Sequence, residues 1–267
     1  MSVALFQPFP MANGRRAQAW RHQPQFRRPR HFHEEPELNL VVRGQGLVGI
    51  GEHVLSVGAG DLVLFHAGQD HVLLEASEDF DLFVMALRPE LSARACASAP
   101  LAVSRSCRLS ATELADATAK LSGLAETRDA VASENHIAEL FRTALSRVTG
   151  GHVVSRRALE FVRAEPGVSG SALAKLLRTP QSAISRRFHQ DLGVRFVEYR
   201  SRLRLMRFVE LVDRGQSFSR AALEADFGSY AQCHRVFHRM LGCAPQDYFA
   251  GARERVDDAR FGVDLLL

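Results

Sequence analysis

Short apolar runs separated by turn residues fill positions 36–87 of this 267-residue chain. The runs cover residues 37–42, 47–50, 53–57, 61–65, 71–74 and 80–84, and glycines punctuate them throughout. Closely spaced runs of this length, with no helical period between them, are typical of strands in a sandwich or small barrel. The pattern therefore predicts an antiparallel jelly roll in this part of the chain.

After Pro89 the apolar positions change to the spacing of amphipathic helices. Two such helices are indicated before Gly150–Gly151, with apolar stripes at Leu114, Ala117, Leu121 and Leu124, and then at Ile137, Leu140, Phe141, Ala144, Leu145 and Val148. They would connect the barrel to the rest of the chain. Their apolar faces suit two arrangements equally well: packing on the barrel of the same chain, or packing on a second copy.

The sequence beyond the double glycine has the stop signals of seven short helices. They are expected at about 155–165, 171–177, 180–192, 196–214, 218–225, 230–241 and 245–249. Ser155, Thr179 and Ser229 fit N-caps, and Gly193 and Gly242 fit C-terminal stops. The helix at 196–214 is apolar on two sides, so it is expected to bridge two small bundles. A short helix, a turn and a longer helix thus occur in the same order on each side of it.

This duplicated unit has the features of a helix-turn-helix, whose second helix enters the DNA major groove while the first crosses the backbone. Ala174 and Ala222 stand where the two helices cross, and Ile184 and Cys233 would anchor each second helix. Polar side chains that suit base edges follow: Gln181, Ser182, Ser185 and Arg186, and then Tyr230, Ala231, Gln232, His234 and Arg235. Flanking cations suit phosphates: Arg187, Arg195, Arg200, Arg202, His238 and Arg239.

The two halves of the chain also differ in net charge. Residues 152–256 hold about 18 Lys and Arg against about 10 Asp and Glu, whereas residues 1–151 are slightly acidic. A basic C-terminal half fits DNA as a partner, although a solvated Arg-rich surface gives the same count. The four cysteines contain no Cys-x-x-Cys pair, which favours buried thiols over a zinc site or a disulfide framework.

The C-terminal sequence resembles the AraC/XylS family of bacterial transcription regulators. The first unit and bridging helix resemble the family at Leu173–Leu177, Ile184–Phe188, Leu192–Gly193, Glu198–Arg200 and Arg202–Arg204, and the second unit at Ala222, Phe227–Gln232, His234–Phe237, Gly242, Pro245 and Tyr248. The resemblance implies that each chain presents two recognition helices to successive major-groove faces. It places Ser182, Ser185, Arg186, Tyr230, Ala231, Gln232 and Arg235 at positions that commonly contact DNA in relatives, and Arg239 joins this DNA-binding set.

The sequence departs from that family at two turns. Arg178 and Asp226 occupy positions where the family usually has Gly, a residue that adopts positive φ without strain. Asp tolerates that conformation, but Arg does so less well. Thr179–Pro180 also falls one residue earlier than the usual Ser-Pro, so the rotation of the first recognition helix is the least defined feature of the site.

Two segments of the N-terminal half resemble the paired motifs of cupin barrels. They are His31–Glu37 followed by Gly44, and Gly60–His71, with His66 at the usual Pro position. On an extended chain His31, His33 and Glu37 face one side, and a neighbouring strand would bring His71 to them. Three imidazoles and one carboxylate suit a divalent transition metal such as zinc, nickel, iron or manganese. Regulators that resemble this one often keep such residues as hydrogen-bonding groups for an organic effector or as plain structure, so all three hypotheses stand.

The expected architecture is a multidomain α and β protein. A cupin-like jelly-roll barrel would occupy residues 1–88, a helical connector able to pair with a second copy 89–151, an all-α DNA-binding domain of two helix-turn-helix units joined by a long helix 152–250, and a tail 251–267. The predicted function is sequence-specific transcription regulation at double-stranded promoter DNA, controlled by a small molecule or metal in the barrel. A homodimer is expected, with RNA polymerase as a further partner if the protein is an activator.

The main alternative is a metal-dependent cupin enzyme, such as a dioxygenase or isomerase, with an accessory helical domain. Such an enzyme needs neither a duplicated helix-turn-helix nor a basic C-terminal half, and we assign no catalytic residue. A protein-binding adaptor does not explain the matched Gln and Arg faces. No apolar window reaches the roughly 18 residues that a membrane span requires, so a cytoplasmic, nucleoid-associated protein is expected.

Overall fold

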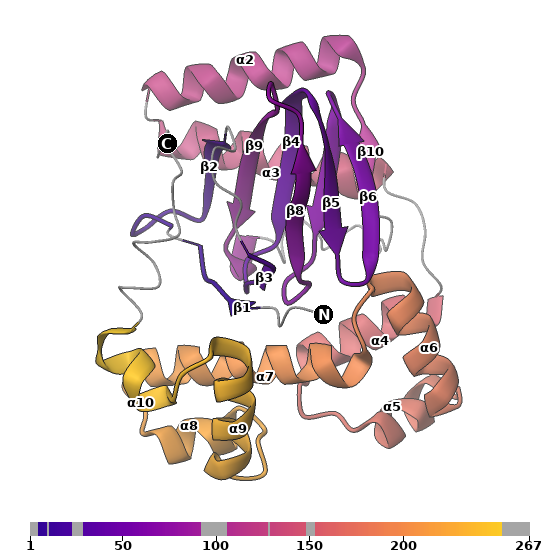
Figure 1. The fold of residues 1–267 in the computed structure, drawn as a ribbon, viewed down its shortest axis with the longest axis vertical. Helices are drawn as coiled ribbons and strands as arrows, with labels where there is room; N and C mark the ends of the chain where they lie inside the picture. Colours follow the sequence, from indigo (N-terminus) through magenta and orange to yellow (C-terminus); the bar gives the residue numbers. More distant parts are fainter. Residues whose placement is uncertain are drawn as a thin grey trace.

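The computed structural model describes residues 5–9, 11–22, 29–91, 106–127, 129–147 and 153–252. The expected boundary at Gly150–Gly151, part of the connector and nearly all of the tail lie outside the described residues. Figure 1 shows a barrel above a helical domain, with α7 running beneath the barrel. Among the described helices, none combines the length and apolar character needed to cross a membrane.

The barrel consists of two five-stranded sheets. One has the order β1 (Leu5–Phe6), β3 (His31–Phe32), β8 (His71–Ala76), β5 (Gln45–Ile50) and β6 (His53–Gly58), and the other β10 (Ser106–Arg108), β7 (Asp61–Phe65), β4 (Glu37–Arg43), β9 (Asp81–Leu87) and β2 (Ala17–His22). All pairings are antiparallel except that of β1 with β3. The predicted β-rich barrel is confirmed, and the six apolar runs correspond to β4–β9.

The connector consists of α2 (Ala111–Thr127) and α3 (Ala130–Arg147). The apolar face of α3 packs on the second sheet, where Ile137, Phe141 and Ala144 share a core with Leu38 and Met85. This face therefore covers the barrel of its own chain, one of the two arrangements that the sequence left open, while α2 packs on α3 as an outer layer (Figure 1).

The helical domain contains the predicted seven helices. They are α4 (Val153–Ala164), α5 (Gly170–Leu177), α6 (Gln181–Leu192), α7 (Phe196–Asp213), α8 (Phe218–Glu224), α9 (Tyr230–Leu241) and α10 (Pro245–Asp247), and a π-helical turn η1 (Tyr248–Ala252) follows. The start of α7 meets the first bundle through Tyr199 against Phe188, and its end meets the second through Phe208 against Phe237. The bridging role expected for this helix is confirmed.

Helix ends agree with the sequence at three points and differ at two. Ser229 caps α9, and Gly193 and Gly242 close α6 and α9 in left-handed conformations. Ser155, however, is fully buried inside α4, because that helix begins two residues earlier. The cap expected at Thr179 is also wrong: Pro180 holds the N-cap position of α6 in extended backbone, and the Thr179 hydroxyl donates to the Leu177 carbonyl over 3.0 Å.

The two helix-turn-helix turns share one backbone pattern. Arg178 and Asp226 are the only non-glycine residues with positive φ in the described ranges, at 48° and 62°. Each lies four positions after its crossing alanine, Ala174 or Ala222, and the amide of the next residue donates to that alanine's carbonyl. The expectation that these turns favour glycine is therefore confirmed, and Arg178 carries the greater strain.

Replacing Arg178 with Gly is expected to stabilise the protein by about 0.5–1 kcal/mol. The left-handed conformation costs a non-glycine residue about 1–2 kcal/mol, and the extra freedom of Gly in the unfolded chain offsets part of that gain. Thermal or urea unfolding of the full chain measures the change. Asp226→Gly is the matched control: Asp tolerates this conformation and Asp226 pairs with Arg207 at 3.8 Å, so we expect no gain there. A lower unfolding midpoint for Arg178→Gly would contradict the strain argument.

Barrel and helical domain pack directly against each other. Phe6 of β1 and Phe32 of β3 belong to the same apolar core as the helices. The Tyr199 hydroxyl of α7 donates to the Ala67 carbonyl over 2.6 Å, and the Glu52 amide donates to the Gly193 carbonyl over 3.0 Å. A Cβ added at Gly51 would lie 2.3 Å from the Gly193 oxygen, so this turn requires glycine for the close approach as well as for its positive φ.

Candidate effector site and nucleic-acid interface

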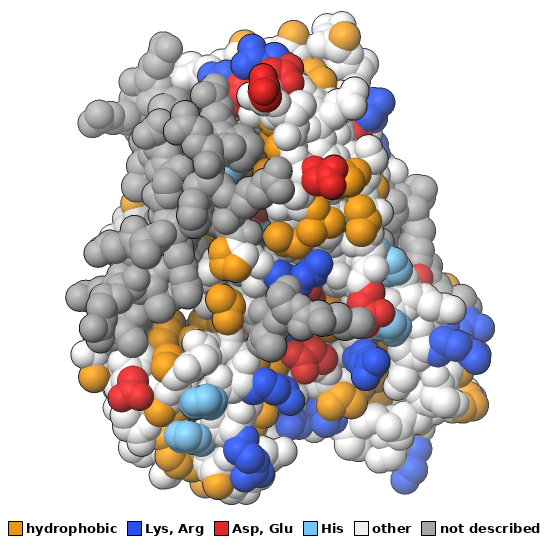
Figure 2. All heavy atoms as spheres, viewed as in Figure 1, with side chains coloured by type: hydrophobic (Ala, Val, Ile, Leu, Met, Phe, Trp, Pro, Cys, Tyr) orange, Lys and Arg blue, Asp and Glu red, His pale blue; other side chains and the backbone are white. Residues whose placement is uncertain are grey.

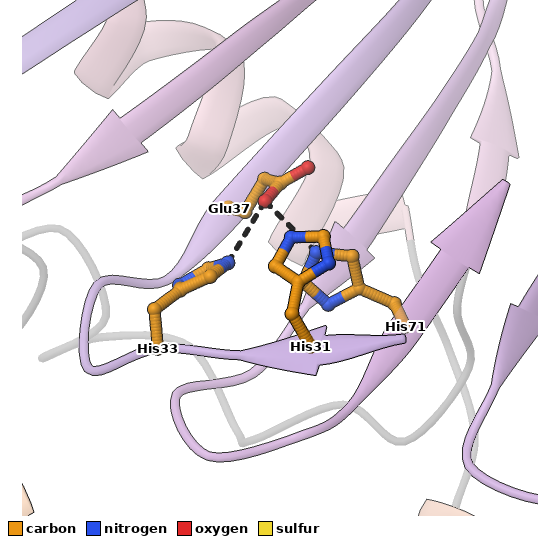
Figure 3. Close-up of side chains that lie close together, drawn as sticks. All are labelled: His31, His33, Glu37 and His71. Carbon is orange, nitrogen blue, oxygen red and sulfur yellow. Dashed lines mark hydrogen bonds and ion pairs between the residues drawn. The ribbon is translucent and has the colours of Figure 1, made fainter. Parts of the chain in front are cut away.

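The four residues singled out at the cupin-like motifs meet at one end of the barrel (Figure 3). His31 lies on β3, His33 in the loop after it, Glu37 at the start of β4 and His71 at the start of β8. Their ligand atoms all lie within 4.8 Å of one another, and all four residues are buried. The pairing of His31 with His71 in the sheet register brings the two motifs together.

The three histidines share one hydrogen-bonding arrangement. Nδ1 of His31 lies 2.9 Å from the Pro29 carbonyl, Nδ1 of His33 lies 2.6 Å from that of Glu35, and Nδ1 of His71 lies 3.2 Å from that of Gln69. Because a carbonyl oxygen only accepts, each Nδ1 carries a proton and donates it. In a neutral imidazole this leaves the lone pair on Nε2.

Two of these Nε2 atoms point at the same carboxylate oxygen. Oε2 of Glu37 lies 2.9 Å from Nε2 of His33 and 3.1 Å from Nε2 of His71. Burial works against the charge of Glu37, but the neighbouring His71 and His33 hold its pKa well below the usual range. An ionised carboxylate facing imidazole nitrogens at these distances requires positive charge between them, either protons on Nε2 or a bound cation.

A cavity extends from this cluster into the barrel and has a volume of about 80 Å³. His31, Glu37 and His71 line its end at the cluster, while Asn39 and His22 add polar atoms farther along β4 and β2. The remainder is apolar, and its lining includes Trp20, Val48, Val57, Phe65, Phe80 and Leu82. Within the described residues, Trp20 Nε1 and Asn39 Oδ1 are buried atoms without a hydrogen-bond partner.

Several of these groups were not identified from the sequence. Trp20 lies on β2, which has no alternating apolar pattern, and Asn39 has no feature that sets it apart from a polar strand residue. His66, which was noted at the position usual for Pro, is buried in the loop after β7 but lies outside the cluster. The cavity is therefore a product of the sheet topology, because its walls come from both sheets.

The two second helices, α6 and α9, carry the predicted DNA-binding residues. Gln181, Ser182, Arg186, Ala231, Gln232, Arg235 and Arg239 are exposed, and Ser185 and Tyr230 are partly exposed. The predicted anchors Ile184 and Cys233 point into the core with 2% and 0% of their surface exposed. Figure 2 shows more Lys and Arg side chains over the helical half than over the barrel.

Three of these DNA-binding side chains also contact their own chain. Gln232 accepts a hydrogen bond from the Gly228 amide at 2.8 Å, so its amide oxygen also closes the turn before α9. Arg239 lies 3.4 Å from the carboxylate of Glu198. Tyr230 stacks on Phe218 with nearly parallel rings. Gln232 and Arg239 would have to exchange these contacts to bind a base or a phosphate.

One of the expected phosphate contacts, Arg202, is wrong, and a second, Arg200, makes a hydrogen bond within its own chain. Arg202 is only 5% exposed, and its guanidinium pairs with Asp70 of the barrel at 2.6 Å. Arg200 is half-buried and donates to the Val168 carbonyl over 2.7 Å, where burial lowers its pKa. The two arginines point to different sides of α7, one to the barrel and one to the loop before α5, and a one-dimensional count of positive charge does not reveal either contact.

The fold and its enclosed cavity define a helix-turn-helix DNA-binding regulator with a ligand-binding barrel. The profile of the AraC-like ligand binding domain family matches residues 16–146, and that of a helix-turn-helix domain family matches residues 173–251. The chain belongs to the AraC/XylS family of transcription regulators. The sequence matches none of the curated proteins with which it was compared.

One solved structure has a similar fold. ToxT from Vibrio cholerae strain SCE256, with a bound unsaturated fatty acid, is 13% identical and aligns over 87% of this chain and 93% of its own, with a TM-score of 0.50. The AraC-like activator CuxR is 13% identical over 75% of this chain and 72% of its own, with a TM-score of 0.36. The C-terminal domain of AraT from Geobacillus stearothermophilus is 19% identical over 36% of this chain and 84% of its own, with a TM-score of 0.35.

Proposed function

We propose that the barrel cavity is the effector site of this regulator, that a divalent transition metal at His31, His33, Glu37 and His71 is the effector, and that its binding changes how α6 and α9 engage promoter DNA. The observation that carries this proposal is the convergence of three imidazoles, each with Nδ1 fixed by a carbonyl, on one carboxylate. Such outer hydrogen bonds orient metal-binding histidines, and three nitrogens with one carboxylate oxygen suit zinc, nickel, iron or manganese.

An organic effector is the second candidate, and the rest of the cavity supports it. Its walls are apolar, while Trp20 Nε1 offers a donor and Asn39 Oδ1 an acceptor that have no partner in the described ranges. A compact molecule with an apolar body and one polar group would fill this space, with its polar group toward the histidines. A binding pocket of this kind buries the apolar body and orients it through a few polar contacts.

The DNA contacts in this proposal come from the exposed faces of α6 and α9. Arg186 and Arg235 would read guanine edges, and Gln181 and Gln232 adenine edges. The 18 residues of α7 span about 27 Å, somewhat less than the roughly 34 Å of one DNA turn, so the two helices would enter successive major grooves of one duplex face.

Assembly and partners complete the proposal. Because α3 covers its own barrel, pairing of two chains would use the outer layer formed by α2. An activator would also contact RNA polymerase, and DNA binding would place the protein at the nucleoid. We propose no catalytic activity: the cluster would act as a sensor, since the duplicated helix-turn-helix is superfluous in a cupin enzyme.

The proposal is tested by selecting genomic DNA fragments with chelator-treated full-length protein, with and without added Zn²⁺, Ni²⁺, Fe²⁺ or Mn²⁺. We expect enrichment of sites with two elements about one helical turn apart, with an affinity that changes when one of these metals is added. Trp20 is the single tryptophan of the chain and lines the cavity, so its fluorescence should report occupancy directly. Enrichment of no sequence would refute the DNA contacts. A fluorescence response to apolar organic compounds but to none of the metals would favour the second candidate.

A further inference from the structure

A buried ion pair joins the barrel to the helix that bridges the two DNA-binding units. The Arg202 side chain of α7 is 6% exposed, and its Nη1 lies 2.6 Å from Oδ1 of Asp70 and 3.1 Å from the Gly68 carbonyl. The guanidinium also lies over the Phe32 ring, 4.9 Å from its centre. Arg30 of the barrel binds the second oxygen of Asp70 at 2.8 Å. Arg202 of the helical domain is thus held mainly by residues of the barrel.

The barrel segments that hold Arg202 are the two that build the metal cluster. Phe32 stands between His31 and His33, and Asp70 directly precedes His71. The histidines face the cluster, whereas Phe32 and Asp70 contact Arg202 of α7. The Gly68 amide donates to the His33 carbonyl over 2.8 Å, which ties the two segments together.

Further contacts from the same loop reach the C-terminal end of α6. Gln69 donates to the Leu192 carbonyl over 2.9 Å from a side chain that is 2% exposed, and Ala67 accepts from Tyr199. The loop of residues 66–70 therefore contacts both the first recognition helix and the bridging helix.

Metal binding would change the dimensions of the cluster. The ligand atoms now lie within 4.8 Å of one another, whereas bonds of about 2.0–2.1 Å in a tetrahedral site place ligands about 3.3 Å apart. The widest pair would move together by up to about 1.5 Å. Since β3 and the start of β8 carry the ligands, Phe32 and Asp70 on their reverse sides would be drawn away from α7.

We infer that Arg202 is the residue through which occupancy of the barrel controls the DNA-binding domain: filling the cluster weakens its contact with Asp70 and Phe32 and releases α7 from the barrel. This inference rests on the proposed effector site. Arg202 is a positioning residue here, since its own contacts are with Asp70, Gly68, Glu198 and Phe32 and not with a cluster residue. Removing its charge should therefore leave metal binding intact and abolish the response.

The experiment compares full-length wild type with Arg202→Met and Asp70→Asn, and with Arg207→Met as the matched control. Arg207 is an exposed arginine of the same helix that pairs with Asp226 inside the helical domain. Calorimetry with Zn²⁺, Ni²⁺ or Mn²⁺ measures binding, and hydrogen exchange of amides 196–206 measures release of α7. Asp70→Asn removes the same ion pair but preserves the shape of the side chain, so it replaces Arg202→Met in the comparison if that variant does not fold.

In wild type and Arg207→Met we expect the bound metal to speed exchange of these amides at least fivefold, the lower end of typical coupling between sites. In Arg202→Met and Asp70→Asn we expect metal to bind at least as tightly as in wild type, because removing a contact that metal weakens strengthens metal binding in return, but a change in exchange below twofold. A full response in either Arg202→Met or Asp70→Asn, or metal binding without a response in wild type, would overturn the inference and leave the effector site standing. Absence of metal binding in wild type would overturn both.

Discussion

Glu37→Gln is expected to lower the affinity of the barrel for divalent metal by at least about 100-fold. The carboxylate is the only anionic group in the cluster, and its side chain is 4% exposed. Without it, three neutral imidazoles and an amide would face a doubly charged cation in a site shielded from water, where unpaired charge is costly. Loss of outer-shell partners alone typically costs 10–100-fold, so loss of a direct ligand should exceed that range.

Calorimetry on chelator-treated protein measures this change, with Trp20 fluorescence as a second reading of the same cavity. Glu75→Gln is the control, because Glu75 is an exposed carboxylate on β8, the strand that carries His71. It should bind metal as wild type does. Equal affinity in Glu37→Gln and wild type would show that the metal binds elsewhere. The cluster would then be assigned to binding of the organic effector.

The sequence predicted those parts of the fold that depend on local pattern. Apolar alternation located β4–β9, and helical spacing with glycine stops located α4–α10, because the side-chain period and the stop residues act within a few positions. Strands β1 and β3 were missed because each is two residues long and owes its place to pairing with a distant segment. Strand β2 was missed because four successive residues are buried, which removes the alternation.

The same distinction applies to the two candidate sites. His31, His33 and Glu37 lie on one stretch of chain, and the two motifs were enough to group them with His71. The expected extended segment is wrong between His33 and Glu37, because a bend at residues 34–35 brings these two side chains within 2.9 Å. The apolar walls of the cavity come from both sheets, and no local pattern marks Trp20 or Asn39 as part of them. Sequence reasoning thus found the polar end of the cavity but not its apolar lining.

Arg202 shows how tertiary packing overrides a local interpretation. As an arginine on a helix beside DNA-reading residues, it fitted a phosphate contact by composition and position. Its burial depends on the helical face that turns toward the barrel and on Asp70, which lies 132 positions earlier in the chain. A buried arginine needs a carboxylate partner, and only the three-dimensional structure identifies it.

Arg186→Ala and Arg235→Ala are each expected to weaken binding to the selected promoter site by about 1–3 kcal/mol, or roughly 5- to 150-fold in Kd, if they read guanine edges. Both side chains are exposed on the second helix of their unit, α6 or α9. Arg142→Ala, an exposed arginine of α3 in the connector, should bind DNA as wild type does. Fluorescence anisotropy at fixed salt on the selected and a scrambled duplex measures the change, because phosphate contacts alone would weaken both duplexes equally.

The double variant decides whether the two units act together on one duplex. The recognition helices lie at opposite ends of α7 (Figure 1), so independent contacts should add to about 2–6 kcal/mol. If only one unit engages DNA at a time, the second substitution would add nothing on a duplex that contains one element. Each single substitution should weaken contacts with only one half of the DNA site, and the two losses should add on a duplex that contains both halves. That result would mean that α7 holds both recognition helices on one face of the duplex.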